Sequence, residues 1–264
     1  SLAESSRELS TAMERLSSGK KINSAADDAA GFAIAERMTA QVRGLNMATK
    51  NANDGLAMLA TIENATNDVT DMLQRVRELA VQASNDTNSS TDRQYLQKEV
   101  DSLLNEINRV ASQTVYNDQV VLDGTHTGQL QVGTDNGQNI TFNIKSIDTD
   151  TLGLTGSGGA SGAFTAGSAP IVISTTSDDN SVDSAGAAKA PAAGTDSVLG
   201  LSVLTAEDAE AALTKITAAI EQVAGNRAEY GAMAHRLEYT VSNLMNVAEF
   251  TTAARSRIED ADFA

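Results

Sequence analysis

Cysteine is absent from this 264-residue chain, which excludes disulfide bonds, thiolate zinc sites and cysteine nucleophiles. Tryptophan is absent as well, and aromatic residues make up only 3% of the chain. No stretch of 18 apolar residues occurs, so no membrane-spanning helix is expected, and the first residues do not resemble a secretion signal. With apolar residues at 41%, a core has to be built from aliphatic side chains and alanine, a composition typical of helical seams.

Basic residues are outnumbered by acidic ones. The chain has 19 Lys and Arg against 35 Asp and Glu, which gives a formal net charge of −16. A field of that sign repels phosphate backbones and anionic lipid surfaces. We therefore expect neither nucleic acid nor a membrane as a partner.

Residues suited to catalysis or metal binding are sparse. Of the two histidines, His126 lies in a polar loop, while His235 precedes Glu238 by three residues on a predicted helix. One such pair without a second pair is a weak basis for a metal site. The glycine-rich run from Gly156 to Gly162 lacks the following helix and lysine of a phosphate-binding loop, so a flexible loop is favoured.

Three aspartates of the middle region, Asp178, Asp179 and Asp183, offer oxygen ligands suited to a divalent cation. Their spacing does not match an EF-hand loop, so a solvated turn is the favoured interpretation and a cation the alternative. Apart from that alternative we expect no cofactor. No constellation of residues indicates an enzyme.

The distribution of charge, glycine and proline divides the chain. Only nine charged residues lie between Thr125 and Gly200, a segment that holds both prolines and twelve of the 19 glycines. The flanks, 1–124 and 201–264, follow helical patterns almost throughout. One helical unit is therefore expected to form from both chain ends.

The clearest helical pattern lies in the C-terminal flank. Apolar and small residues there follow 3,4 spacing, a heptad seam of about five repeats that predicts a helix from about Ala206 to Asp260. Its members are Leu213, Ile216, Ile220, Val223, Arg227, Tyr230, Ala234, Leu237, Val241, Leu244 and Ala248. Thr205 with Asp208 predicts the start of this helix as a capping box. Gly225 and Gly231 lie inside it, where they weaken the helix or permit a close helix contact.

The N-terminal flank predicts two more helices. A stripe from Leu56 to Ala83 ends at a polar run, and a second stripe from Leu96 to Val110 follows, so an antiparallel helical hairpin is expected. Ser24 with Asp27 resembles another capping box, and Gly19 is expected to end a short first helix.

The middle region predicts strands instead. Apolar residues alternate with polar ones between Leu130 and Ile144, on either side of Asn136 and Gly137, which is a β-hairpin signal. A further strand is expected at Ile171 to Ser174. The predicted fold class is α+β: a long antiparallel helical bundle or coiled coil built from both chain ends, 1–124 and 201–264, with the hairpin 129–144 attached. A variable, surface-exposed domain of strands and loops is expected at 145–200.

Three segments together resemble bacterial flagellin, the subunit of the flagellar filament. They are ERLSSGKKINSAADDAAGFAIAERM (Glu14 to Met38) with NANDG (Asn51 to Gly55) and QRVRELAVQ (Gln74 to Gln82), then LQVGTDNGQNITFNI (Leu130 to Ile144), and finally TAARSRIEDADFA (Thr252 to Ala264). The resemblance covers roughly three quarters of the chain. It implies a structural protein of the bacterial flagellum, secreted and extracellular, that polymerises through its helical domain to form the propeller for swimming motility.

Partners follow from the same resemblance: other flagellin subunits, a flagellar export chaperone and hook-associated proteins. Flagellins continue beyond both ends of the matching region, so this chain resembles a trimmed fragment and is expected to stay monomeric. Two other functions remain open. One is a flagellin homologue that acts as a cell-surface receptor or adhesin for polysaccharide, and the other is a junction protein between hook and filament.

The resemblance also implies a contact site. The segment QRVRELAVQ and the facing helix resemble the flagellin region bound by Toll-like receptor 5, and the matching positions are Arg75, Leu79, Gln82 and Glu99. The first three recur at four and three residues and are expected to share one helical face. Arg75 is expected to lie off the apolar stripe with its guanidinium free for a partner. Contact with a neighbouring subunit is the favoured native role of this face.

Overall fold

The computed structural model describes residues 1–154 and 201–261 of the chain. Its internal contacts define two compact units, and each draws on both flanks. Unit 1 comprises Ser1–Leu59, Gly128–Phe142 and Ala232–Ala264, and unit 2 comprises Ala60–Thr127 and Asn143–Gly231. The strand expected at 171–174 and the three candidate cation-binding aspartates lie outside the described residues. The predicted domain boundary at residue 145 stays a prediction.

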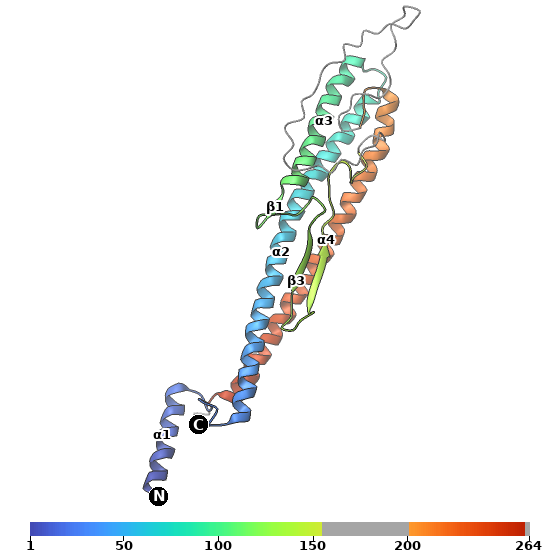
Figure 1. Cartoon of the computed structure of the whole chain (residues 1–264). Coiled ribbons are helices and arrows are strands. Elements are labelled where there is room, and N and C mark those ends of the chain that lie inside the picture. Colours follow the sequence, from blue (N-terminus) through green and yellow to red (C-terminus); the bar gives the residue numbers. More distant parts are fainter. Residues whose placement is uncertain (155–200, 262–264) are drawn as a thin grey trace, which may run out of the picture. The chain divides into compact units, whose positions relative to one another are not determined.

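Two long helices run through the architecture, α2 (Ala29–Ala83, 55 residues) and α4 (Ala206–Glu259, 54 residues). Figure 1 shows them side by side in both units, with a small amount of β-structure beside them. The predicted fold class is confirmed: long helices from both chain ends are combined with short strands. The predicted extent of the C-terminal helix, Ala206 to about Asp260, is also confirmed.

The line of buried residues on α4 follows the predicted seam only in part. Six seam members are buried: Ile216, Val223, Tyr230, Leu237, Leu244 and Ala248. The seam members Leu213, Ile220 and Arg227 are only half-buried, whereas Ala212, Ala219 and Asn226, each one residue earlier, are buried. At these places on α4 the small or short side chains of Ala212, Ala219 and Asn226 are thus the ones buried, and the larger side chains that follow each of them lie partly exposed beside the buried line.

Unit 1 begins with α1 (Leu2–Ser18), which buries none of its residues. Its end at Gly19 is confirmed: Gly19 adopts a left-handed conformation with φ 70°, and its N–H donates to the carbonyl of Arg15. The parts of α2 and α4 in this unit are antiparallel and enclose a small core of Leu45, Ala48, Leu244 and Ala248.

A β-hairpin packs on α2 within unit 1, as the alternating pattern predicts. Its strands are β3 (Thr127–Gln131) and β4 (Asn139–Asn143), and Gly137 in the turn has φ 85°. The side-chain amide of Asn51 on α2 donates to the carbonyl of Gln131 at 3.0 Å. Gly128 is needed for packing, because a Cβ there would lie 2.0 Å from the Phe142 ring.

The predicted capping box of Ser24 and Asp27 does not cap α2. The Asp27 carboxylate does accept bonds from the backbone N–H groups of Asn23 and Ser24, but it closes a turn before the helix. Asp28 is the residue that caps α2, since its carboxylate accepts the N–H of Gly31 at 3.0 Å. Two consecutive aspartates both offer capping chemistry, and the later one lies next to the first helical residue, Ala29.

The cap of α4 is confirmed in part. Thr205 accepts the N–H of Asp208 at 3.0 Å, but the Asp208 carboxylate accepts from the Ser202 hydroxyl instead of completing the box. A Cβ at Gly225 or Gly231 would meet no atom within 4 Å, so neither glycine mediates a close helix contact within the described residues.

Unit 2 contains α3 (Ser90–Gln113), which folds back antiparallel on α2 as predicted. Ser89 caps α3 through a reciprocal pair of bonds with Asp92. A small hairpin of β1 (Val115–Tyr116) and β2 (Gln119–Val120) follows, with Asn117 and Asp118 at positive φ in its two-residue turn. The sequence analysis did not predict this hairpin, because its turn lacks the glycine of the usual hairpin signals, although Asn and Asp tolerate positive φ.

Candidate interaction site

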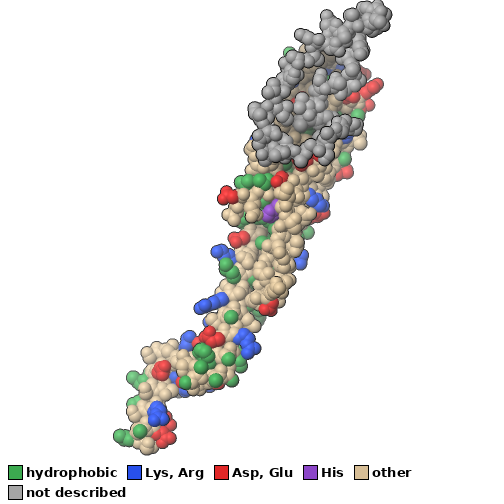
Figure 2. Space-filling model, viewed as in Figure 1, with side chains coloured by type: hydrophobic (Ala, Val, Ile, Leu, Met, Phe, Trp, Pro, Cys, Tyr) green, Lys and Arg blue, Asp and Glu red, His purple; other side chains and the backbone are tan. Residues whose placement is uncertain are grey.

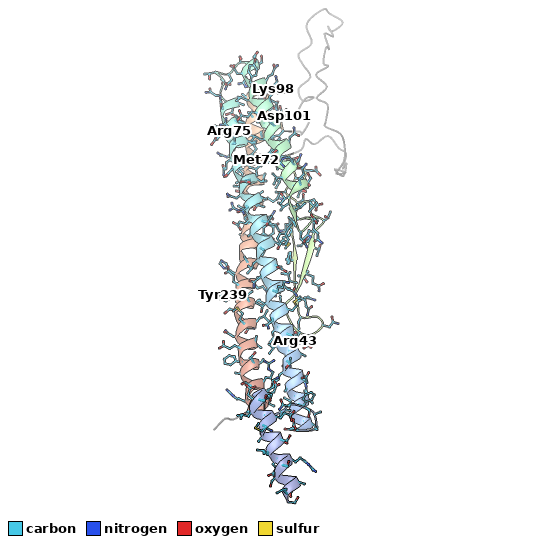
Figure 3. All side chains as sticks on the ribbon, turned by 90° about the vertical axis from the view of Figure 1, so that its left-hand side faces the viewer. Arg43, Met72, Arg75, Lys98, Asp101 and Tyr239 are labelled. Carbon is cyan, nitrogen blue, oxygen red and sulfur yellow. The ribbon has the colours of Figure 1, made fainter. Side chains whose placement is uncertain are left out.

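Unit 2 brings Arg75 and Glu99 together across the α2–α3 pair. The Arg75 Nε and Nη2 atoms both lie 2.8 Å from Glu99 Oε1, and its Nη1 lies 3.1 Å from Glu78 Oε2. About half of each side chain of the Arg75–Glu99 pair remains exposed. Figure 3 shows Arg75 on this outer surface of the helical bundle.

The expectation of a free Arg75 guanidinium is therefore wrong. Hydrogen bonds to Glu99 and then to Glu78 raise the pKa of Arg75 above its ordinary value. The sequence shows Glu78 one turn away, but the contact with Glu99 depends on the register of α3 against α2. A partner that uses Arg75 has to accept an arginine already held by two carboxylates.

The remaining predicted site residues are divided between surface and core. Gln82 and Glu99 are exposed, whereas Leu79 is 1% exposed and belongs to the apolar core. The four positions therefore do not form one contiguous exposed face. Leu79 supports the surface from beneath, while Arg75, Gln82 and Glu99 are available to a partner.

Gln97 on α3 is a buried polar residue that the sequence analysis missed. Its side-chain amide donates to the carbonyl of Leu201 and to the carboxylate of Asp101, both at 2.9 Å. Its carbonyl oxygen accepts the N–H of Val203 at 2.7 Å. Through these hydrogen bonds Gln97 connects α3 to the segment that leads into α4. No local pattern marks it, because its backbone partners are more than 100 positions away.

The candidate metal pair on α4 is a simple surface contact, with His235 Nδ1 3.3 Å from Glu238 Oε2. Within residues 1–154 and 201–261, no group of three or more His, Cys, Asp or Glu side chains is arranged to hold a metal ion. In the same residues, no helix combines the length and apolar character needed to cross a membrane.

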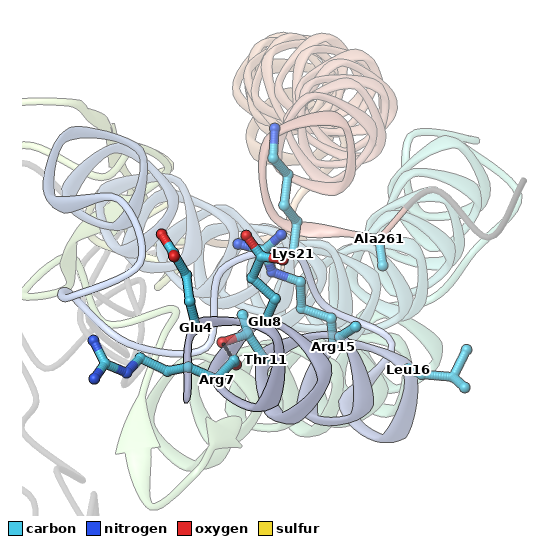
Figure 4. A pocket seen from close by; sticks show the side chains of 9 residues that line it. Glu4, Arg7, Glu8, Thr11, Arg15, Leu16, Lys21 and Ala261 are labelled. Atoms are coloured by element: carbon cyan, nitrogen blue, oxygen red, sulfur yellow. Dashed lines mark hydrogen bonds between the residues drawn. The ribbon is translucent and has the colours of Figure 1, made fainter. Parts of the chain in front are cut away.

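A pocket of about 720 Å³ lies in unit 1. It lies between α1 and the turn after it, and Figure 4 shows its charged lining. The lining residues are Glu4, Arg7, Glu8, Thr11, Ala12, Arg15, Leu16, Lys21 and Ala261. The pocket mixes both charge signs and contains no nucleophile paired with a base, so it does not suggest a reaction.

Charges of both signs are also interspersed over the molecular face in Figure 2. The arrangement of the described residues therefore favours contact with other macromolecular surfaces, through side chains on the outer sides of long helices.

Comparison with known proteins points to one family. Residues 1–127 match the family model for the bacterial flagellin N-terminal helical region, and residues 213–264 match the model for the C-terminal helical region. The chain is 38% identical to flagellin from Bacillus subtilis over 265 aligned positions, which cover 96% of this chain and 80% of that protein.

Two further similarities cover different parts. Flagellin from Salmonella paratyphi A is 52% identical over 153 residues, which amount to 58% of this chain and 31% of the relative. The chain thus spans about a third of the length of that relative. In fold alone, it resembles a putative flagellar hook-associated protein from Vibrio parahaemolyticus, with a TM-score of 0.61 at 12% identity over 89% of this chain and all of the other.

Proposed function

The chain belongs to the bacterial flagellin family, and we propose that it is a structural subunit of a bacterial flagellar filament. The observation that carries the proposal is that each unit combines helix from the two family-matched ends of the chain, α2 from one and α4 from the other. Such a unit buries its own apolar stripe and leaves its outer helix surfaces for contacts with other copies.

In this function the protein is extracellular and its main partner is another copy of itself. An export chaperone and hook-associated proteins are proposed as further partners on family resemblance. For the surface of Arg75, Gln82 and Glu99 we propose contact with a neighbouring subunit in the filament. A free monomer exposes these side chains and presents them to Toll-like receptor 5.

Deletion of the gene and complementation with the complete native gene test the filament role. We expect the deletion to abolish filaments seen by electron microscopy and swimming in soft agar, and the wild-type gene to restore both. A frameshifted gene serves as the control. A deletion strain that keeps its filaments and its swimming would contradict the proposal.

The receptor alternative is tested in the same strains. Purified protein is titrated with acidic and neutral glycans, and the deletion strain is assayed for glycan attachment. Saturable glycan binding together with unchanged motility would replace the filament role by that of a cell-surface receptor or adhesin.

A further inference from the structure

Two large aromatic side chains lie in water on the part of α4 that belongs to unit 1. Tyr239 is 79% exposed and Phe250 is 76% exposed. Figure 3 shows Tyr239 projecting from α4 away from α2. Only seven aromatic residues occur in the described part of the chain, so two of them on one helix surface are a marked concentration. Exposed aromatic side chains of this kind are typical of protein contact surfaces.

These aromatics belong to a surface that we call the α4 patch. Its members Arg236, Tyr239, Asn243, Val247 and Phe250 are all exposed and recur at three or four residues, so they lie on one side of the helix. Part of the patch borders an open, shallow groove lined by Arg236, Tyr239 and Asn243 among others. Tyrosine and arginine are the residue types that most often dominate binding energy at interfaces.

The nearby charges leave Arg236 as the only cationic member of the α4 patch. His235 and Glu238 contact each other on a neighbouring face, and Glu249 precedes Phe250. No ion pair of Arg236 occurs within the described residues. A partner surface with unpaired carboxylates therefore complements this patch.

The chain itself contains such a surface, because its negative charge is concentrated in unit 2. Unit 1 has 10 Lys and Arg against 13 Asp and Glu, whereas unit 2 has 9 against 22. On α2 within unit 2, Asn64, Asp68 and Asp71 are exposed at 4,3 spacing; we call them the acidic patch. Neither aspartate has an ion-pair partner in the described residues, and Arg75, one turn further, is held by two glutamates.

We propose that the α4 patch of one copy docks on the acidic patch of a second copy. The proposal rests on the filament function and specifies which surfaces meet. Tyr239 and Phe250 supply the apolar contact area, and Arg236 pairs with Asp68 or Asp71 of the second copy. Because the two patches are different surfaces, the contact is heterologous and each copy keeps one free patch of each kind, as an open filament requires.

The first test compares variants in the deletion strain. Tyr239→Ala with Phe250→Ala should reduce the amount of assembled filament at least about tenfold, since hot-spot aromatics dominate such contacts. Tyr95→Ala is the matched control, because Tyr95 is 64% exposed but lies in unit 2 outside both patches, and it should assemble like the wild type. Normal assembly of the double variant would overturn the proposal. Failure of the wild-type gene itself would instead refute the filament function.

A charge exchange separates contact from folding. Arg236→Asp should reduce assembly, Asp68→Arg with Asp71→Arg should do the same, and the triple variant should regain most of the filament mass. Circular dichroism of each purified variant checks that it is folded. Reduced assembly in both parents without recovery in the triple variant would overturn the assigned pairing.

The absence of cysteine permits a direct proximity test. Subunits from the complete native gene that carry Asn243→Cys are assembled together with subunits that carry Asn64→Cys and treated with a short bismaleimide. A cross-linked dimer is expected only in the mixture, and each variant alone should give none. A mixture that assembles into filaments without a dimer band would contradict the proposed docking.

Discussion

Replacing Gln97 by leucine should destabilise unit 2 strongly although the two side chains are similar in size. Gln97 is 4% exposed and satisfies two backbone groups of the segment before α4. Leu201 and Val203, which carry those groups, are 1% and 0% exposed, so water cannot take the place of the amide. An unsatisfied buried backbone group costs about 1–3 kcal/mol, so Gln97→Leu should lower the free energy of unfolding by about 2–5 kcal/mol.

Urea unfolding followed by circular dichroism at 222 nm measures this change, and the slope against denaturant should stay similar. Gln94→Leu is the control, since Gln94 lies one turn earlier on α3 and is exposed. Amide hydrogen exchange gives a local readout: the Val203 N–H should exchange faster in the Gln97 variant. Equal midpoints for wild type and Gln97→Leu would refute the assigned role of these hydrogen bonds.

Three further outcomes are expected. Leu237→Asp should lower the free energy of unfolding by at least about 3 kcal/mol, because Leu237 is fully buried and the charge would lack a partner; an unchanged melting temperature would contradict this. Arg75→Ala should weaken Toll-like receptor 5 binding in a surface plasmon assay while changing stability by less than about 1 kcal/mol, since its ion pair is half exposed; unaltered affinity would reject the proposed contact. The hydrogen bond from the Ser89 N–H lowers the pKa of Asp92 below 3.8 in the folded chain. The stabilisation that the ionised Asp92 carboxylate gives is therefore present above pH 3.8 and is lost as the pH falls through the lowered pKa. Asp92→Asn should flatten the fall in melting temperature on acidification below about pH 4.

Local patterns predicted much of the fold, because helices and hairpins depend on neighbouring residues. Heptad spacing located α4, Gly19 ended α1, and the alternation around Gly137 predicted the β3–β4 hairpin. The capping residue of α2 was misassigned because Asp27 and Asp28 both suit a cap and only Asp28 lies next to the first helical residue.

The candidate site was less predictable because it depends on how distant segments meet. The spacing of Arg75 and Leu79 on one helix does not reveal that Leu79 is buried by neighbouring elements. Nor does it reveal that Glu99 lies opposite Arg75, which follows from the register of α3. Gln97 is a stronger case, since both of its backbone partners belong to a segment that is distant in sequence.

The uneven charge of the chain bears on how copies of an acidic protein associate. Two copies that meet through their unit 2 surfaces bring together segments with 22 acidic and only 9 basic residues each, and these repel. Unit 1 is close to neutral and carries the exposed aromatics Tyr239 and Phe250. A contact between unit 1 of one copy and unit 2 of the next therefore combines apolar burial with weaker repulsion. Such a contact also sets a direction, because it joins two different surfaces, and direction is what distinguishes a growing filament from a closed pair.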